Sequence, residues 1–307
     1  MRVSVVVCTY SDDRYEDFTE AVDSVLAQRH DPIEIVLVID GNESVAARTR
    51  ETYGGREDVI VHCNDENLGV SASRTKGAEL ASGEVVAFID DDAIAEPDWI
   101  TELVRVYESR DALAVGGQMV GEWIAGRPWF LPDEFNWLVG VTHRGFAESG
   151  DVVRNTFESN ISFRRDVFLE LGGFDSGLGP TADSYSHSEG AEIGTRLQTE
   201  YGRGVIYNTD AIVRHKVFEY RIQFRWLCHR AFEQGVSKRT MEQRSTTSSG
   251  EEFGFLKELS IKHVPRRLQL AWNSPSTSNI GQLLMLFVFT GLVGTGYVFE
   301  AIRDLLN

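Results

Sequence analysis

The amino-acid sequence predicts an α/β fold in which helices cover both faces of a mostly parallel central sheet. Short, continuous apolar runs alternate over residues 1–115 with segments whose apolar side chains recur at helical spacing. Continuous apolar runs indicate strands that are buried on both faces, as parallel strands are. Their alternation with helices is typical of a doubly wound sheet. The chain has 307 residues, 42% of them hydrophobic, which is enough for a substantial core.

The strands and helices alternate in order along the first third of the chain. Apolar runs predict strands over residues 3–10, 33–39, 59–63 and 84–89. Helical spacing predicts helices over residues 18–26, 43–53 and 71–80. Pro97 opens a further helix, because proline is favoured in the first helical turn.

Residues 117–150 show neither the pattern of a buried strand nor the spacing of a helix. Trp123, Trp129 and Trp137 lie there among prolines and phenylalanines, which makes half of the six tryptophans of the chain. Two interpretations stay open. The tryptophans either line a contact surface for an acceptor, or they form a small hydrophobic cluster under a long loop.

The charge of the chain is strongly negative and unevenly distributed. The net charge is −17, which disfavours nucleic acid as a partner through simple repulsion. Residues 1–220 carry a net charge of −21, whereas residues 221–307 carry +4. A basic surface suits anionic lipid, so the last part of the chain is predicted to contact a membrane.

The basic part divides into two segments. Residues 221–275 mix arginines and lysines with aromatic residues, which predicts an amphipathic region lying on the membrane surface. Residues 276–307 are predicted to be a hydrophobic anchor, because residues 280–299 contain no charge and match the thickness of a bilayer core. A buried helix or an interfacial hairpin is the alternative for this anchor.

The orientation at the membrane is predicted from the flanking charges and the cysteines. Lys262, Arg266 and Arg267 precede the apolar segment, and this bias keeps the preceding domain in the cytoplasm. The three cysteines lie in apolar runs and are odd in number, so we expect reduced thiols. The N-terminus enters a predicted strand at once, so we expect no signal peptide.

Three carboxylates end the apolar run at residues 85–89. Asp90, Asp91 and Asp92 are predicted to lie at the carboxyl edge of the sheet, where α/β folds bind their ligands. If the chain stays extended, Asp90 and Asp92 point the same way and can share one divalent cation that holds a diphosphate. The alternative is a chance acidic triplet in a chain with 47 acidic residues.

Other polar residues follow neighbouring strands. Thr9, Tyr10 and Asp40 end two of them, and residues 64–74 form a glycine-containing loop that leads into a helix. Such a loop can present backbone N–H groups and Arg74 to phosphate. A surface ion pair is the alternative role of Arg74.

Residues 1–220 resemble family 2 glycosyltransferases of the GT-A fold. Matching segments occur in order at residues 5–10, 40–42, 64–74, 89–92 and 172–175. The resemblance implies a catalytic domain with a nucleotide-binding half at residues 1–115 and an acceptor half at residues 116–220.

The resemblance also implies the nucleotide-sugar site. Thr9, Tyr10 and Asp40 would bracket the base, with Asp40 accepting its imide N–H, while Asn67 and Arg74 would lie beside the base and phosphates. Asp90 and Asp91 would contact the nucleotide sugar, with Asp90 at the ribose. Mg²⁺ or Mn²⁺ would be held by Asp92, with Asp90 and His215 as further candidate ligands.

Family members invert the anomeric centre, so a carboxylate must deprotonate the acceptor hydroxyl. A Glu-Asp pair at the start of a helix usually supplies it, but this chain has Gly190 where the aspartate is expected. Glu189, Glu192 and Asp183 are the candidates. Two structural roles compete with this one, because Ser186 and Glu189 form a capping-box pattern and Glu192 can pair with the residue four positions later.

Further segments, at residues 161–165, 218–221 and 287–290, resemble one haloarchaeal branch of the family. That branch transfers a hexuronic acid to a glucosylated dolichyl phosphate during N-glycosylation of the surface-layer glycoprotein. The resemblance implies a UDP-glucuronate donor, a dolichyl-phosphate-linked acceptor, and a site at the cytoplasmic face of the cell membrane. The alternatives are a hexosyltransferase that makes dolichyl-phosphate sugar or extracellular polysaccharide, and a non-catalytic nucleotide-sugar-binding membrane protein.

Overall fold

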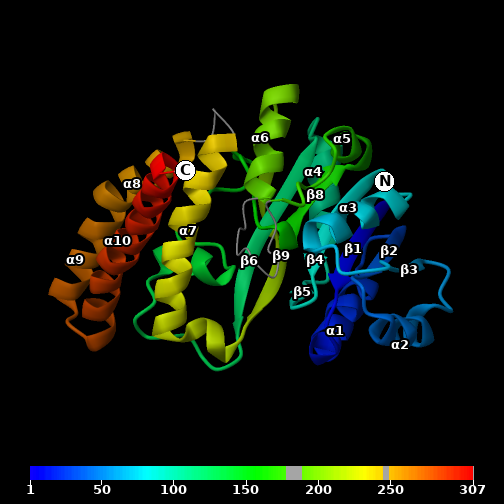
Figure 1. Cartoon of the computed structure of the whole chain (residues 1–307), viewed down its shortest axis with the longest axis horizontal. Coiled ribbons are helices and arrows are strands. Elements are labelled where there is room, and N and C mark those ends of the chain that lie inside the picture. Colours follow the sequence, from blue (N-terminus) through cyan, green and yellow to red (C-terminus); the bar gives the residue numbers. More distant parts are fainter. Residues whose placement is uncertain (178–188, 245–248, 307) are drawn as a thin grey trace. The chain divides into compact units, whose positions relative to one another are not determined.

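The protein, described here as a computed structural model, is built around one mixed sheet. Its strands are β1 (Val3–Thr9), β2 (Ile33–Ile39), β3 (Val59–Cys63), β4 (Val85–Asp90), β5 (Ala93–Ala95), β6 (Ala114–Trp123), β7 (Val152–Val153), β8 (Ile161–Arg164) and β9 (Val205–Val217). They lie in the order β3-β2-β1-β4-β8-β6-β9-β5, with β7 beside β9 (Figure 1). The structure describes residues 1–177, 189–244 and 249–306.

The predicted parallel arrangement is found in the half of the sheet that β1, β2, β3 and β4 form. β1 runs parallel to both β2 and β4, and β2 runs parallel to β3. β8 is antiparallel to β4 and β6, and β5 and β7 are antiparallel to β9. In the register, Thr9 pairs with Ile39 and Cys8 pairs with Asp90, so the ends of these strands meet at one edge of the sheet.

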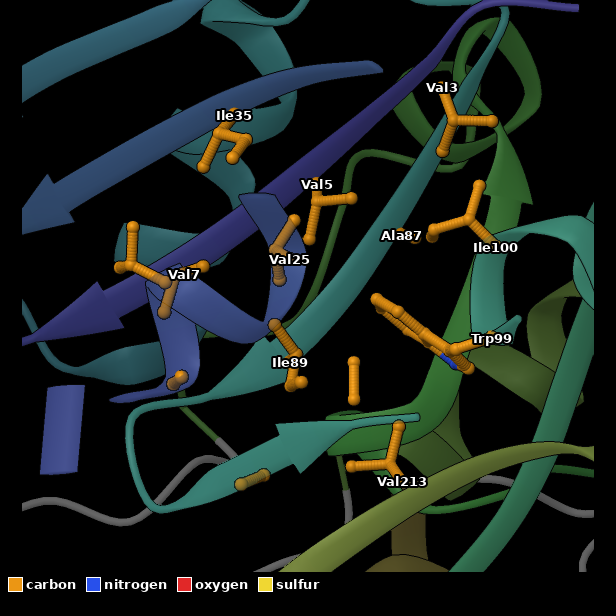
Figure 2. Packing of buried hydrophobic residues seen from close by; sticks show 14 of the residues in the cluster. Val3, Val5, Val7, Val25, Ile35, Ala87, Ile89, Trp99, Ile100 and Val213 are labelled. Carbon is orange, nitrogen blue, oxygen red and sulfur yellow. The ribbon is translucent and has the colours of Figure 1, made fainter. Parts of the chain in front are cut away.

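One face of the sheet is covered by α1 (Tyr15–Leu26), α2 (Glu43–Tyr53) and α4 (Trp99–Ser109). Alternate residues of each strand point to this face, among them Val5 and Val7 of β1 and Ile89 of β4 (Figure 2). Trp99 is fully buried in the same cluster. The predicted helices over 43–53 and after Pro97 are thereby confirmed, and the apolar residues of each face the sheet.

The opposite face carries α3 (Val70–Leu80), α5 (Arg165–Glu170) and α6 (Glu189–Tyr201). α3 lies very close to the strands beneath it, because a Cβ built on Gly77 would come within 2.4 Å of Val6 Cγ1. Helices on both faces are therefore confirmed. The three cysteines are free, and burial raises the pKa of the Cys8 thiol.

The chain forms two structural units. The first unit comprises Met1–Val120 and Ala147–His215, and the second comprises Gly121–Phe146 and Lys216–Asn307. The second unit therefore includes residues 121–146, which the sequence analysis placed in the acceptor half of the catalytic domain.

The second unit is mostly helical. Its elements are the 3-10 helix Asp133–Val139, α7 (Phe224–Arg244), α8 (Ser249–Glu258), the π-helical segment Leu259–His263, α9 (Val264–Asn273) and α10 (Thr277–Leu306). α10 packs along α7, and glycines bring the two backbones together. A Cβ on Gly235 would lie 2.0 Å from the Val293 carbonyl oxygen, and one on Gly296 would lie 2.0 Å from that of Phe232.

A buried ion cluster stabilises the second unit. Glu134 is fully buried and accepts hydrogen bonds from Arg267, whose Nη2 lies 2.7 Å from Glu134 Oε2. Arg266 Nη1 lies 3.1 Å from the other carboxylate oxygen. Arg267 is itself only 3% exposed, so removing the carboxylate would leave a buried cation without its main partner.

We therefore expect Glu134→Ala to lower the free energy of unfolding of this unit by about 3–5 kcal/mol, the cost typical of breaking a buried ion pair. Denaturant titration of the full chain in detergent, followed by tryptophan fluorescence, measures it. Glu258→Ala is the matched control, since it removes an exposed pair with Lys262 and should cost roughly 1 kcal/mol or less. Equal losses in the two variants would contradict the assignment.

Candidate active site

The acidic triplet lies where β4 ends. Asp90 is the last residue of β4, and Asp91 and Asp92 form a turn that leads into β5. The expectation of an extended chain through the triplet is wrong, because the chain turns at Asp91 and Asp92. Asp90 pairs with Arg74, whereas Arg14 lies beside both Asp91 and Asp92. The side chains of Asp90 and Asp92 are therefore not brought to one cation by the alternation of side chains along an extended strand.

Asp92 faces a histidine and an arginine. In the register of β5 and β9, Ala93 pairs with His215, which brings His215 Nε2 to 3.4 Å from Asp92 Oδ1. Arg14 Nη1 donates to the other oxygen, Asp92 Oδ2, at 3.0 Å. Both Asp92 and His215 are buried. Arg14 thus holds the carboxylate so that one oxygen faces the imidazole.

This pair of side chains fits a divalent metal ion. Mg²⁺ is usually held by one or two protein ligands together with substrate phosphates and water, and at bond lengths of 2.0–2.1 Å two adjacent ligand atoms lie roughly 3 Å apart. Asp92 Oδ1 and His215 Nε2 are near that separation. Within residues 1–177, 189–244 and 249–306, no group of three or more His, Cys, Asp or Glu side chains is arranged to hold a metal. Asp92 and His215 would thus leave coordination positions open to other ligands.

Asp91 supports the turn. Thr9 Oγ1 donates to Asp91 Oδ2 at 2.8 Å, and Arg14 Nη1 lies 3.4 Å from Oδ1. Burial and the neighbouring charge of Asp92 raise the pKa of Asp91 to about 7. The structure thus joins Thr9 and Asp91, two residues predicted to contact the nucleotide sugar, to each other.

Asp40 organises the loop that follows β3. Its Oδ1 accepts hydrogen bonds from Asn64 Nδ2 at 2.8 Å and from the Leu68 N–H at 2.9 Å, and its Oδ2 accepts from the Gly69 N–H at 2.8 Å. The loop passes close to Gly41, where a Cβ would lie 2.4 Å from the backbone nitrogen of Asn67. The role of Asp40 toward a base stays a prediction, and these contacts give it a second role in shaping the loop.

The surface beside this loop is open. Tyr10 is 57% exposed, Leu68 is 49% exposed, and Asn67 is also exposed. An exposed aromatic ring and an aliphatic side chain offer flat apolar surface to a nucleotide base.

Arg74 lies among carboxylates. It is buried, it donates a short hydrogen bond to Asp90 Oδ1, and its Nη1 lies 3.5 Å from Glu189 Oε1. The alternative of a surface ion pair is therefore wrong. Contact of Arg74 with a phosphate stays a prediction.

Glu158 completes this cluster, although it is not among the site residues predicted from the sequence. Glu158 Oε1 accepts a hydrogen bond from the Gly190 N–H at 2.9 Å. Burial raises the pKa of Glu158. Burial and the nearby charge of Glu158 also raise the pKa of Glu189 to about 8, whereas the positive charge of Arg74 acts to lower it. Arg14 was also missed. The glycine at position 190 was the one available signal for Glu158.

The other two candidate bases are placed differently. Glu192 forms an ion pair with Arg196 across one helical turn, with two nitrogen–oxygen distances of 2.6 Å. Asp183, like Ser186, lies outside the described residues. The assignment of a base to Glu189, Glu192 or Asp183 stays a prediction.

The three tryptophans all belong to the second unit. The Trp137 ring packs against Phe135 and edge-on against Phe255, which agrees with a local hydrophobic cluster. Trp129 is 55% exposed, and one edge of its ring packs on Gly281 of α10. Trp123 is partly buried against the same cluster. Their predicted contact with an acceptor stays a prediction.

Comparison with known proteins identifies the family. Residues 4–172 match the model of glycosyl transferase family 2. The chain is 52% identical, over 97% of its length and 96% of the relative, to the glucosyl-dolichyl phosphate glucuronosyltransferase of Haloferax volcanii.

Two solved structures share the fold. One is the mannosyltransferase PcManGT of Pyrobaculum calidifontis in complex with GDP-Man and Mn²⁺, with a TM-score of 0.59 and 16% identity over 99% of this chain and 87% of that one. The other is S. aureus TarS in complex with UDP, with a TM-score of 0.55 and 16% identity over 100% of this chain and 92% of that one. Together, the matched domain and the end-to-end identity show that this chain is a glycosyltransferase and belongs to glycosyl transferase family 2.

Proposed function

We propose that the chain transfers glucuronate from UDP-glucuronate to a glucosyl-dolichyl phosphate lipid, as a step of N-glycosylation of the surface-layer glycoprotein. The observation that carries the proposal is the 52% identity to the Haloferax volcanii enzyme, which extends over 97% of this chain. Because the alignment extends along nearly the whole chain, the similarity covers the helical second unit as well as the sheet. It therefore supports a shared acceptor in addition to a shared fold.

The nucleotide sugar binds at the carboxyl edge of β1, β2 and β4. The base lies on the exposed ring of Tyr10, beside the loop that Asp40 holds in place. Asp90 accepts the ribose hydroxyls, since its side chain is 32% exposed while Arg74 fixes one of its oxygens. Arg74 in turn adds positive charge near the phosphates.

Asp92 and His215 would hold Mg²⁺ or Mn²⁺ together with the diphosphate. When bound there, the ion stabilises the negative charge that develops on the departing nucleoside diphosphate. Arg14 keeps Asp92 oriented through its contact with Oδ2. A carboxylate of the cluster around Arg74 takes the proton of the acceptor hydroxyl as that oxygen attacks the sugar.

The second unit attaches the protein to the cytoplasmic face of the cell membrane. α10 is the helix of the described part that is long and apolar enough to cross a membrane. Exposed apolar residues recur along one side of it: Ile280, Leu284, Phe287, Val298, Ile302 and Leu305. On another side it packs on α7, which carries Arg225, Arg230, Glu233, Lys238, Arg239 and Glu242. A crossing α10 would draw these charges into hydrocarbon at high cost, so α10 lies along the membrane surface.

Single cysteines at the two ends of α10 test this orientation. Ser276→Cys and Arg303→Cys are expected to react with a membrane-impermeant maleimide from the same, cytoplasmic side of sealed vesicles. Chain without an added cysteine is the control for the three native thiols. Labelling of the two positions from opposite sides would show that α10 crosses the bilayer.

A panel of donors tests the reaction. Purified full-length chain is incubated with glucosyl-dolichyl phosphate and, in turn, UDP-glucuronate, UDP-glucose, UDP-N-acetylglucosamine or GDP-mannose, and the lipid product is identified by mass spectrometry. We expect transfer from UDP-glucuronate to exceed that from each other donor. Transfer of another sugar, or to dolichyl phosphate itself, would favour a hexosyltransferase. Donor binding without turnover would favour a non-catalytic protein.

A further inference from the structure

Position 190 lacks the side chain that the family resemblance leads one to expect, and a carboxylate from another element takes its place. An ideal Cβ built on Gly190 would lie 2.1 Å from Glu158 Oε1 and 2.8 Å from Glu158 Cδ. No larger residue fits at position 190 while Glu158 stays where it is. The carboxylate of Glu158 thus occupies the space that a side chain at the start of α6 would fill.

Glu158 is held firmly in this place. The Gly190 N–H donates to its Oε1, and Glu158 itself begins the short 3-10 turn Glu158–Asn160 that precedes β8. The next residue in the turn, Ser159, accepts a hydrogen bond from the Asp90 N–H at 3.0 Å. Asn160 accepts from Trp99 Nε1 at 2.8 Å in the core. These contacts fix the turn against the end of β4, directly beside the acidic triplet.

The two neighbouring glutamates, Glu189 and Glu192, each face an arginine. Glu189 is 2% exposed and faces Arg74, and Glu192 is paired with Arg196. Glu158 is partly exposed and forms no ion pair with the residues that the structure describes. A carboxylate that abstracts a proton must be reachable by the acceptor and must not be locked to a cation. Of these three glutamates, Glu158 meets both conditions.

We propose that Glu158 is the general base of the transfer. Its carboxylate takes the proton from the acceptor hydroxyl, the hydroxyl oxygen forms a bond to the anomeric carbon, and the bond from that carbon to the diphosphate breaks. The electron pair of the broken bond leaves with the nucleoside diphosphate. The proposal rests on the proposed glycosyl transfer, and it assigns to Glu158 the task that a residue at position 190 would otherwise perform.

Glu158→Gln tests the assignment directly. The amide oxygen can still accept from the Gly190 N–H, so the turn keeps its shape while the base is lost. We expect kcat to fall by about 10²- to 10⁴-fold, the range typical of general-base catalysis. The Kd for UDP with Mn²⁺ should stay within about twofold. Glu79→Gln is the control, and it should keep kcat within about threefold because it removes only an exposed pair with Lys76.

A relocation experiment distinguishes a base from a structural carboxylate. Glu158→Ala removes the three atoms that lie nearest to a Cβ at position 190, so Gly190→Asp is added in that background. The kcat of the double variant should be at least tenfold higher than that of Glu158→Ala. In the presence of the native Glu158, Gly190→Ala should lower kcat, because its Cβ displaces the carboxylate.

The outcomes separate the two proposals. Full activity of Glu158→Gln, or no recovery in the double variant, would overturn the role of Glu158 while transfer by the wild-type chain still stood. A wild-type chain that transfers no sugar from any donor of the panel would overturn the proposed function, and the role of Glu158 with it.

Discussion

Asp92→Asn is expected to lower kcat by roughly 10³-fold, because a metal that stabilises a departing diphosphate, as proposed here, is worth several kcal/mol in the transition state. The substitution keeps the size of the side chain but removes the charge that faces His215 and Arg14. Steady-state transfer from UDP-glucuronate, measured over a range of Mn²⁺ concentrations, checks it.

Two controls make the Asp92→Asn result specific. Circular dichroism should show that the variant is folded. Asp98→Asn, which removes an exposed pair with Arg29, should leave kcat unchanged. Undiminished transfer by Asp92→Asn would contradict the metal site.

Arg74→Ala is expected to lower the free energy of unfolding by about 3–5 kcal/mol at pH 8, because it leaves the carboxylates of Asp90 and Glu189 without their shared cation. The loss should be smaller at pH 5. Burial raises the pKa of Glu189 from 4.5 to about 8, so at pH 5 the folded state holds this group neutral and needs the arginine less. Between these values the unfolded state releases a proton that the folded state keeps, so stability falls as the pH rises.

Denaturant titrations of Arg74→Ala at pH 5 and pH 8 measure this difference. Arg74→Lys is the matched variant, since a lysine keeps the charge but cannot reach both carboxylates with the same fork of donors. It should lose less stability than Arg74→Ala at pH 8. A loss in Arg74→Ala that is equal at both pH values would contradict the neutral state of Glu189.

The first half of the fold is predictable from the sequence because its signals are local. The strands over 33–39 and 59–63 and the helix over 43–53 are found with the predicted bounds. Each is a continuous apolar run or a helical stripe that ends at polar or glycine residues. The carboxyl ends of parallel strands meet by topology alone, so the meeting of Thr9, Asp40 and the acidic triplet could be anticipated.

The antiparallel half was harder to predict, because its pairings link residues that are far apart in sequence. β9 is 13 residues long, but its apolar runs, residues 205–207 and 211–213, are only three residues each. The partner of Asp92 depends on the pairing of β5 with β9, and no local pattern reveals that register.

The partners of the site residues also required the structure. Arg14 lies 77 positions before Asp91, and Glu158 reaches Gly190 over 32 positions. The extended geometry expected for the acidic triplet failed because the chain turns at Asp91 and Asp92. In contrast, the glycine at position 190 was visible in the sequence, and in the structure the Glu158 carboxylate lies against it.

The proposed transfer depends on one divalent ion that Asp92, His215 and a diphosphate would hold together. Electron paramagnetic resonance of free Mn²⁺, titrated with the full-length protein in the presence and absence of UDP, measures this binding directly. We predict that the wild-type chain depletes free Mn²⁺ strongly only when UDP is present, and that Asp92→Asn loses this UDP-dependent binding. Mn²⁺ binding that is unchanged by UDP, or equal in the wild type and in Asp92→Asn, would contradict the account.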